Sequence, residues 1–121
     1  MSTIVDATIP AEQFALHEAL ETVPSAEFEV LPVIAHGTDR LMPYIWASGA
    51  DFERIDRALA DDPSVENVES LTVLDEEYLY KMEWRAHIRI VIYMLVEENA
   101  SILGLTGKND RWHVRVLFPE H

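Results

Sequence analysis

The chain has 121 residues, enough for one domain with a single hydrophobic core, and 49% of them are hydrophobic. Its 22 acidic residues outnumber 9 Lys and Arg, and the resulting net charge of −13 opposes binding to phosphate backbones and to anionic membranes. Cysteine is absent, which excludes disulfides, thiolate nucleophiles and zinc–thiolate sites.

The acidic residues are spread from Asp6 to Glu120 rather than collected in a tail, and the only lysines are Lys81 and Lys108. A hydrated surface rich in carboxylates is typical of halophilic proteins, and we favour that interpretation over an ordinary acidic domain. The N-terminus lacks the features of a signal peptide, and no apolar run reaches the roughly 20 residues that a membrane span needs. We therefore expect a soluble, cytoplasmic protein.

The start of the chain predicts a strand followed by a helix. Residues 3–9 alternate weakly between apolar and polar side chains, as in a short strand. Pro10, with Glu12 soon after it, suits the first turn of a helix, and Val23-Pro24 ends that helix. The apolar side of this helix consists of Phe14, Leu16 and Leu20.

The next segment predicts a β-hairpin and a second helix. Residues 28–36 and 41–47 both alternate, and the glycine-containing sequence at 37–39 turns the chain between them. Asp51 suits the N-cap of a helix that the proline-containing residues 61–64 end. The buried stripe of that helix consists of Phe52, Ile55, Ala58 and Leu59.

A strand at residues 65–74 leads to the stretch from Tyr78 to Glu98, which changes its period part-way. One strand face at its start carries Tyr78, Tyr80, Met82 and Trp84. From His87 onwards the apolar residues follow a helical period, which predicts a third helix. The stripe of this third helix consists of Ile88, Val91, Ile92, Leu95 and Val96.

The chain closes with a predicted hairpin of residues 100–106 and 111–118. One face of its second strand carries Trp112, Val114, Val116 and Phe118. The element order β-α-β-β-α-β-β-α-β-β predicts an α+β fold, in which an antiparallel sheet and three helices form a sandwich related to ferredoxin-like folds. No linker or repeat divides the chain, so we expect residues 1–121 to form a single domain.

Signatures of known catalytic sites are missing, including the Gly-rich phosphate loop, the nucleophile elbow and the H-E-x-x-H zinc motif. His17 and Glu21 are four residues apart on the predicted first helix, but two donors do not make a metal site. We therefore expect no catalytic residue, metal or cofactor. The carboxylates at predicted turns, Asp61-Asp62 and residues 75–77, are expected to lie in solvent.

The residues most suited to bind a small molecule are His36, Arg40, Trp84, Arg85 and Arg89. His36 ends a strand near Asp39, and this couple could do acid–base chemistry inside a cleft, although a turn histidine bonded locally is the preferred interpretation. Arg85 and Arg89 could bind an anion near the start of the third helix, although pairing with surface carboxylates is preferred. Trp84 could line an apolar pocket, although core packing is preferred.

Two segments carry a resemblance to a known family: YKMEW at residues 80–84 and WHVRVLFP at residues 112–119. With the rest of the chain, they resemble the N-terminal domain of haloarchaeal bacterio-opsin-activator-type transcription regulators. The resemblance implies an input or assembly domain that precedes a C-terminal helix-turn-helix. This sequence stops before any helix-turn-helix, so the resemblance places no DNA-reading residue, catalytic residue or ligand on it.

The favoured function is a non-enzymatic input or assembly domain of a transcription regulator that does not itself bind DNA. One alternative is a sensor of a small-molecule effector, with its pocket between the sheet and the third helix, and a less favoured one is an acid–base enzyme using His36 and Asp39. The last strand has an apolar face, and Pro119-Glu120 begins a covering helix that the chain does not complete. We therefore expect a homodimer or larger symmetric assembly through the terminal hairpin or its sheet face.

Overall fold

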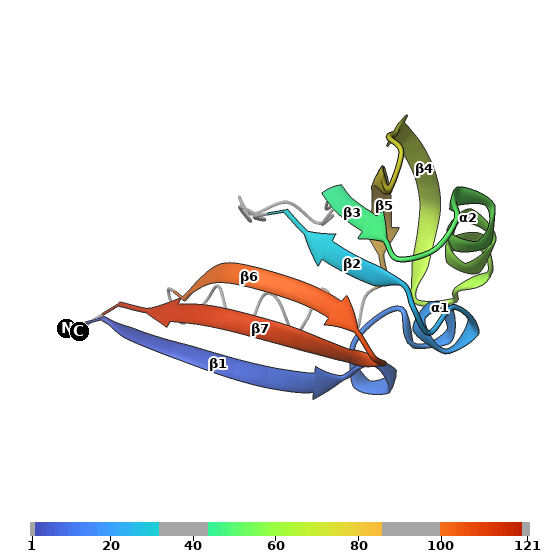
Figure 1. Cartoon of the computed structure of the whole chain (residues 1–121). Coiled ribbons are helices and arrows are strands. Elements are labelled where there is room, and N and C mark those ends of the chain that lie inside the picture. The colour runs from blue at the N-terminus through green and yellow to red at the C-terminus, as the bar shows by residue number, and fades with distance from the viewer. Residues whose placement is uncertain (1, 32–43, 86–99, 120–121) are drawn as a thin grey trace.

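A computed structural model describes residues 2–31, 44–85 and 100–119. The strands of this part of the chain form one seven-stranded antiparallel sheet in the order β1-β7-β6-β2-β3-β5-β4 (Figure 1). The strands are β1 (Thr3–Pro10), β2 (Glu27–Val30), β3 (Tyr44–Ser48), β4 (Val65–Val73), β5 (Glu77–Trp84), β6 (Ser101–Lys108) and β7 (Arg111–Phe118). The helices are the 3-10 helix η1 (Ala11–Gln13) and the α-helices α1 (His17–Thr22) and α2 (Phe52–Asp61). The predicted α+β class with an antiparallel sheet is confirmed.

The sheet has two parts that diverge from each other (Figure 1). We call β1, β7 and β6 the terminal arm, and β2, β3, β5 and β4 the helix-covered part, because α1 and α2 lie beside those strands (Figure 1). Within the described residues, β2 and β6 join the two parts through only two residue pairs, Phe28 with Gly107 and Glu29 with Thr106. The indole ring of Trp112 covers this junction so closely that a Cβ at Gly107 would lie 2.9 Å from its Cε2.

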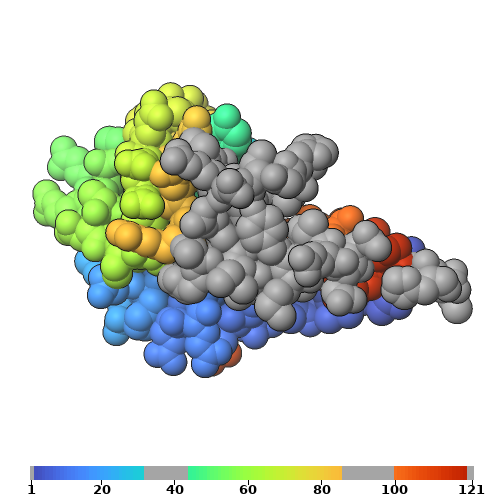
Figure 2. Space-filling view, turned by 180° about the vertical axis from the view of Figure 1, so that it is seen from behind, coloured from blue at the N-terminus to red at the C-terminus, as the bar shows by residue number. Residues whose placement is uncertain are grey.

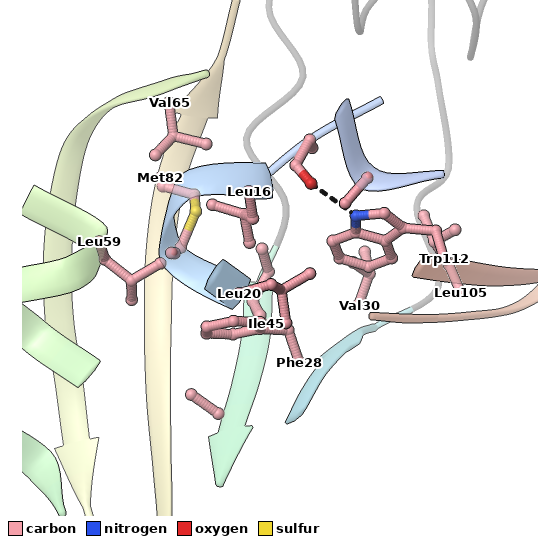
Figure 3. Packing of buried hydrophobic residues seen from close by; sticks show 14 of the residues in the cluster. Leu16, Leu20, Phe28, Val30, Ile45, Leu59, Val65, Met82, Leu105 and Trp112 are labelled. Carbon is pink, nitrogen blue, oxygen red and sulfur yellow. Dashed lines mark hydrogen bonds between the residues drawn. The ribbon is translucent and has the colours of Figure 1, made fainter. Parts of the chain in front are cut away.

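The core contains the aromatic side chains that the alternation in β5 and β7 predicts on single strand faces. The β5 members of that core are Tyr78, Tyr80, Met82 and Trp84. Phe14 joins the two strands, since its ring meets Trp84 edge-on at 5.7 Å and Trp112 edge-on at 5.4 Å between centroids. Trp112 donates its indole N–H to the carbonyl of Ala15 at 2.7 Å (Figure 3).

The predicted first helix is divided into two short pieces, so the expectation of one helix from Pro10 to Val23 is wrong. The chain makes η1, then Leu16 takes a left-handed backbone conformation with φ 57°, and only then does α1 begin. In a continuous helix the carbonyl of Ala15 would accept from the amide of Ala19. Here the Ala15 carbonyl accepts from the Trp112 indole, and the Ala19 amide donates to the carboxylate of Asp62. Contacts with distant residues therefore replace the helical hydrogen bond.

The predictions for α2 and for the last hairpin agree with the structure, whereas the turn predicted at residues 37–39 lies outside the described residues. The stripe predicted for α2 is buried at Ile55, Ala58 and Leu59, and Asp51 is its N-cap residue, although the Asp51 side chain makes no capping hydrogen bond. The β6–β7 hairpin turns over two residues, Asn109 with φ 53° and Asp110 with φ 57°. Two consecutive positive φ angles define the primed turn that suits a twisted hairpin.

The ferredoxin-like order is wrong, although one of its units is present. Strands β3 and β4 flank α2 and run parallel with β5 between them, which is a split β-α-β unit. Strands β1 and β2 flank α1 but are separated by β7 and β6 and run antiparallel. The described residues contain two α-helices, and the predicted third helix, from 88 to 96, lies outside them.

Candidate functional site

Three of the five predicted ligand-binding residues, His36, Arg40 and Arg89, lie outside the described residues, as does Asp39. The other two, Trp84 and Arg85, are neighbours at the end of β5. The side chain of Trp84 is 2% exposed, and its indole N–H has no hydrogen-bond partner among the described residues. The side chain of Arg85 is exposed and lies 4.0 Å from a carboxylate oxygen of Glu66, a surface ion pair that contributes little.

His17 is held by two carboxylates from different parts of the fold. Its Nδ1 lies 2.8 Å from Asp110 Oδ1 in the β6–β7 turn, and its Nε2 lies 3.2 Å from Glu21 Oε2 on α1. The hydrogen bond to Asp110 raises the pKa of His17 above its ordinary value. Two acceptors around one ring favour the imidazolium rather than a metal ligand, and the described residues contain no cluster of three metal-ligating side chains. The sequence pairs His17 with Glu21, but Asp110 is 93 residues away and only the fold reveals it.

Asp62 is buried, so the expectation that it lies in solvent is wrong. The residue is only 3% exposed. Its carboxylate accepts hydrogen bonds from the amides of Ala19 at 2.9 Å and Ser64 at 2.8 Å, and from the Ser64 hydroxyl. The Ser64 hydroxyl oxygen in turn accepts from the amide of Leu16 at 2.9 Å. Residues after α2 therefore cap the N-terminus of α1, whose own cap residue, Leu16, has no side chain able to do so.

A small cleft lies between α1 and α2. The buried residues Val23 and Ala58 line it. Its other lining residues are Glu18, Thr22, Arg54, Arg57 and Asp61. Neither Arg54 nor Arg57 makes a hydrogen bond or ion pair with another described residue, and these are two of only nine cations in the chain. The cleft therefore offers two guanidinium groups that have no partner among the described residues, beside the buried Val23 and Ala58.

The terminal arm has a face on which no described helix packs (Figure 1). A shallow depression lies on this face over Gly104, where a Cβ would meet no atom within 4 Å. Around the depression, Arg115 donates to both carboxylate oxygens of Asp6, at 2.8 and 3.4 Å. The hydrogen bond from Arg115 lowers the pKa of Asp6, and both side chains are exposed. This ion pair neutralises the only charged side chain of β1.

Residues 4–121 match the family model of the BAT domain, described as a GAF and HTH_10 associated domain. The chain belongs to the BAT family. This domain is the N-terminal region of bacterio-opsin activator-type regulators, so the resemblance carried by YKMEW and WHVRVLFP is confirmed. No curated protein and no solved structure shows significant similarity to the chain.

The family makes this BAT domain a regulatory accessory domain, which argues against an enzyme. The described helices of the BAT domain include none long and apolar enough to cross a membrane. Its described geometry offers two surfaces on which a partner could bind: the cleft between α1 and α2, and the terminal arm with its edge strand β1.

Proposed function

We propose that this BAT domain is a non-catalytic assembly domain that joins two copies of its regulator and does not itself bind DNA. The observation that carries the proposal is the outer edge of β1. All of its eight residues except Ile9 are exposed, and Ile4 and Val5 are 58% and 41% exposed. An exposed strand edge with apolar side chains is a template for pairing with another chain.

The charge of the chain favours a second copy on this edge rather than elsewhere. Two molecules with a net charge of −13 repel each other wherever their carboxylates meet. β1 contains a single acidic residue, Asp6, and Arg115 of the neighbouring strand neutralises it. The edge of β1 is thus a nearly neutral surface on an acidic molecule, and two-fold pairs are the most frequent symmetric assembly.

Light scattering in molar KCl tests the assembly. We expect a mass of twice 13.8 kDa, independent of concentration over a tenfold range. Val5→Asp places a charge on the edge and should give a monomer. Val73→Asp is the matched control, since Val73 is 54% exposed on the opposite edge strand, β4, and this variant should remain a dimer. A 13.8 kDa mass for the unmodified chain at every concentration would rule out the proposal.

The same charge motivates the proposals that the domain avoids DNA and works in a salt-rich cytoplasm. Its carboxylates oppose the phosphates of a duplex, so a mobility-shift titration at roughly physiological salt should show no binding tighter than the micromolar range of non-specific binders. High salt shortens the Debye length from about 10 Å at 0.1 M to about 3 Å at 1 M, which screens the self-repulsion. The melting temperature should therefore rise between low and multimolar KCl, and equal midpoints would contradict the halophilic interpretation.

A second candidate function is binding of a small anionic effector, favoured by the unpaired Arg54 and Arg57 in the cleft between α1 and α2. Guanidinium groups bind carboxylates through paired hydrogen bonds. The pocket predicted between the sheet and a third helix falls on residues outside those described, and this cleft is a separate candidate. Citrate, compared with chloride at equal ionic strength, should raise the melting temperature. Arg54→Gln with Arg57→Gln should abolish that shift and Arg85→Gln should keep it, whereas an equal shift in all three proteins would argue against the cleft.

A further inference from the structure

The edge of β1 is regular enough to specify how a second copy would pair with it. All eight residues of β1 pair with β7 without a register shift, from Thr3 opposite Phe118 to Pro10 opposite Arg111. In the view from behind, the dark blue atoms of β1 form the lower margin of the terminal arm (Figure 2). A regular strand with one paired side presents an unbroken row of backbone donors and acceptors on the other side.

The opposite edge strand, β4, is protected against the same kind of pairing. Its pairing with β5 shifts twice, between Glu66 and Glu69 and between Ser70 and Thr72. Asn67, within the first shift, has φ 53° and donates a side-chain hydrogen bond to Glu83. Register shifts and charged side chains are the devices by which natural proteins keep edge strands from pairing. Among the described strands, the two edges of this sheet are therefore unequal, and β1 is the one without register shifts on its paired side.

Resting on the proposed function, we infer that β1 pairs antiparallel with β1 of a second copy, with Ala7 on the two-fold axis. A two-fold antiparallel pair needs one residue opposite itself, and residues opposite each other point to the same face. An axis at Asp6 would place two carboxylates face to face. An axis at Ala7 instead places Asp6 opposite the second copy's Thr8 and Val5 opposite the second copy's Ile9.

The Ala7 axis also pairs more residues of β1 and places apolar side chains opposite each other. It pairs residues 4–10, whereas an axis at Thr8 pairs only 6–10. Val5 and Ile9 lie opposite Val116 and Trp112 of β7, so they share the face of the arm on which those buried side chains lie. Pairing Val5 with the second copy's Ile9 therefore continues the apolar face across the axis. Asp6 and Arg115 stay together on the other face.

Engineered cysteines test the register cleanly, because the chain contains no cysteine of its own. Opposite Cα atoms in an antiparallel pair lie about 4.5–5.5 Å apart, within the range of a disulfide. Ala7→Cys should therefore form a covalent dimer on oxidation at low protein concentration. Thr8→Cys is the matched control, because its two copies would sit on a diagonal about 7–8 Å apart and should stay largely uncoupled.

A mixture of two variants gives a second test that leaves Ala7 unchanged. Asp6→Cys and Thr8→Cys proteins should each cross-link poorly alone but couple to each other when mixed, since Asp6 lies opposite the second copy's Thr8. Adding Val5→Asp to Ala7→Cys should remove the cross-link. A dimeric mass without Ala7→Cys coupling, or with stronger Thr8→Cys coupling, would overturn this register and leave the proposed assembly standing. A monomeric mass would overturn both.

Discussion

The helix-covered part and the terminal arm contain strands with similar alternation, but β5 of the first lies between two strands and β1 of the second lies at the edge of the sheet. In β5 every second residue is buried, and α2 packs there through Phe52, whose ring meets Tyr78 at 5.4 Å and Tyr80 at 6.3 Å between centroids. In β1 the same kind of alternation leaves every residue but Ile9 exposed. Alternation predicts which residues share a face, and the place of the strand in the packed sheet decides how far that face is buried.

The two parts also differ in how they are held. The helix-covered part has a buried polar network at Asp62 and a hydrogen bond of 3.1 Å from the Tyr80 hydroxyl to Asp56 on α2, and burial raises the pKa of Tyr80. The arm joins it through two residue pairs of β2 and β6, the Trp112 ring, and the contact of His17 with Asp110. We expect the helix-covered part to hold most of the stability and propose the arm as the site of assembly. The variants below test how the two parts are held.

The largest effect is expected for Asp62→Ala, which removes the cap of α1. The amides of Ala19 and Ser64 would lose their buried acceptor, so the free energy of unfolding should fall by about 2–4 kcal/mol. Asp61→Ala is the neighbouring control, since Asp61 is exposed, and should change stability by less than about 0.5 kcal/mol. Urea denaturation measures both. Equal stability of the two variants would mean that the network does not hold the helix-covered part.

A smaller effect is expected at the junction. Gly107→Ala places a Cβ 2.9 Å from the Trp112 ring and should cost about 1–3 kcal/mol, because neither the strand nor the ring can move without breaking other contacts. Gly104→Ala is matched, since it is on the same strand with nothing within 4 Å, and should change stability by less than about 0.5 kcal/mol. Thermal melts of the two variants compare them directly. Similar losses for both would show that the junction does not depend on the contact of Trp112 with Gly107.

The smallest effect is a pH dependence of the link between His17 and Asp110. The hydrogen bond raises the pKa of folded His17 above the unfolded value, so its stabilisation is complete below about pH 6.5 and is lost as the pH rises through the folded pKa. The melting temperature of the natural chain should exceed that of His17→Gln most at low pH, and the gap should narrow above neutrality. The difference in melting temperature between the natural chain and Asp110→Asn should narrow in the same way. A difference that widens as the pH rises would contradict the raised pKa of folded His17.

Most strands and the class of fold were predictable from the residues alone, because each rests on a period of a few positions. The alternation in β5 and β7 predicts their buried faces, including Trp84 and Trp112, and the stripe of α2 predicts its packing. The resemblance to a regulator family was predictable for the same reason, since it rests on short runs such as YKMEW. Of the residues suggested for ligand binding, Trp84 and Arg85 are described. Their preferred interpretations agree with the structure, since Trp84 packs in the core and Arg85 lies near the surface carboxylate of Glu66.

Other features depend on contacts between residues far apart in the chain, and no local pattern encodes them. The amide of Ala19 bonds Asp62, 43 residues away, which divides the predicted first helix and buries a carboxylate expected in solvent. The partner of His17 is 93 residues away. β1 lies at the edge of the sheet because its described partner is β7, a strand far along the chain. The physical reason is that the energy of a periodic face is the same wherever it is buried. Which strand becomes an edge, and which amide a carboxylate caps, is settled only when the elements pack together.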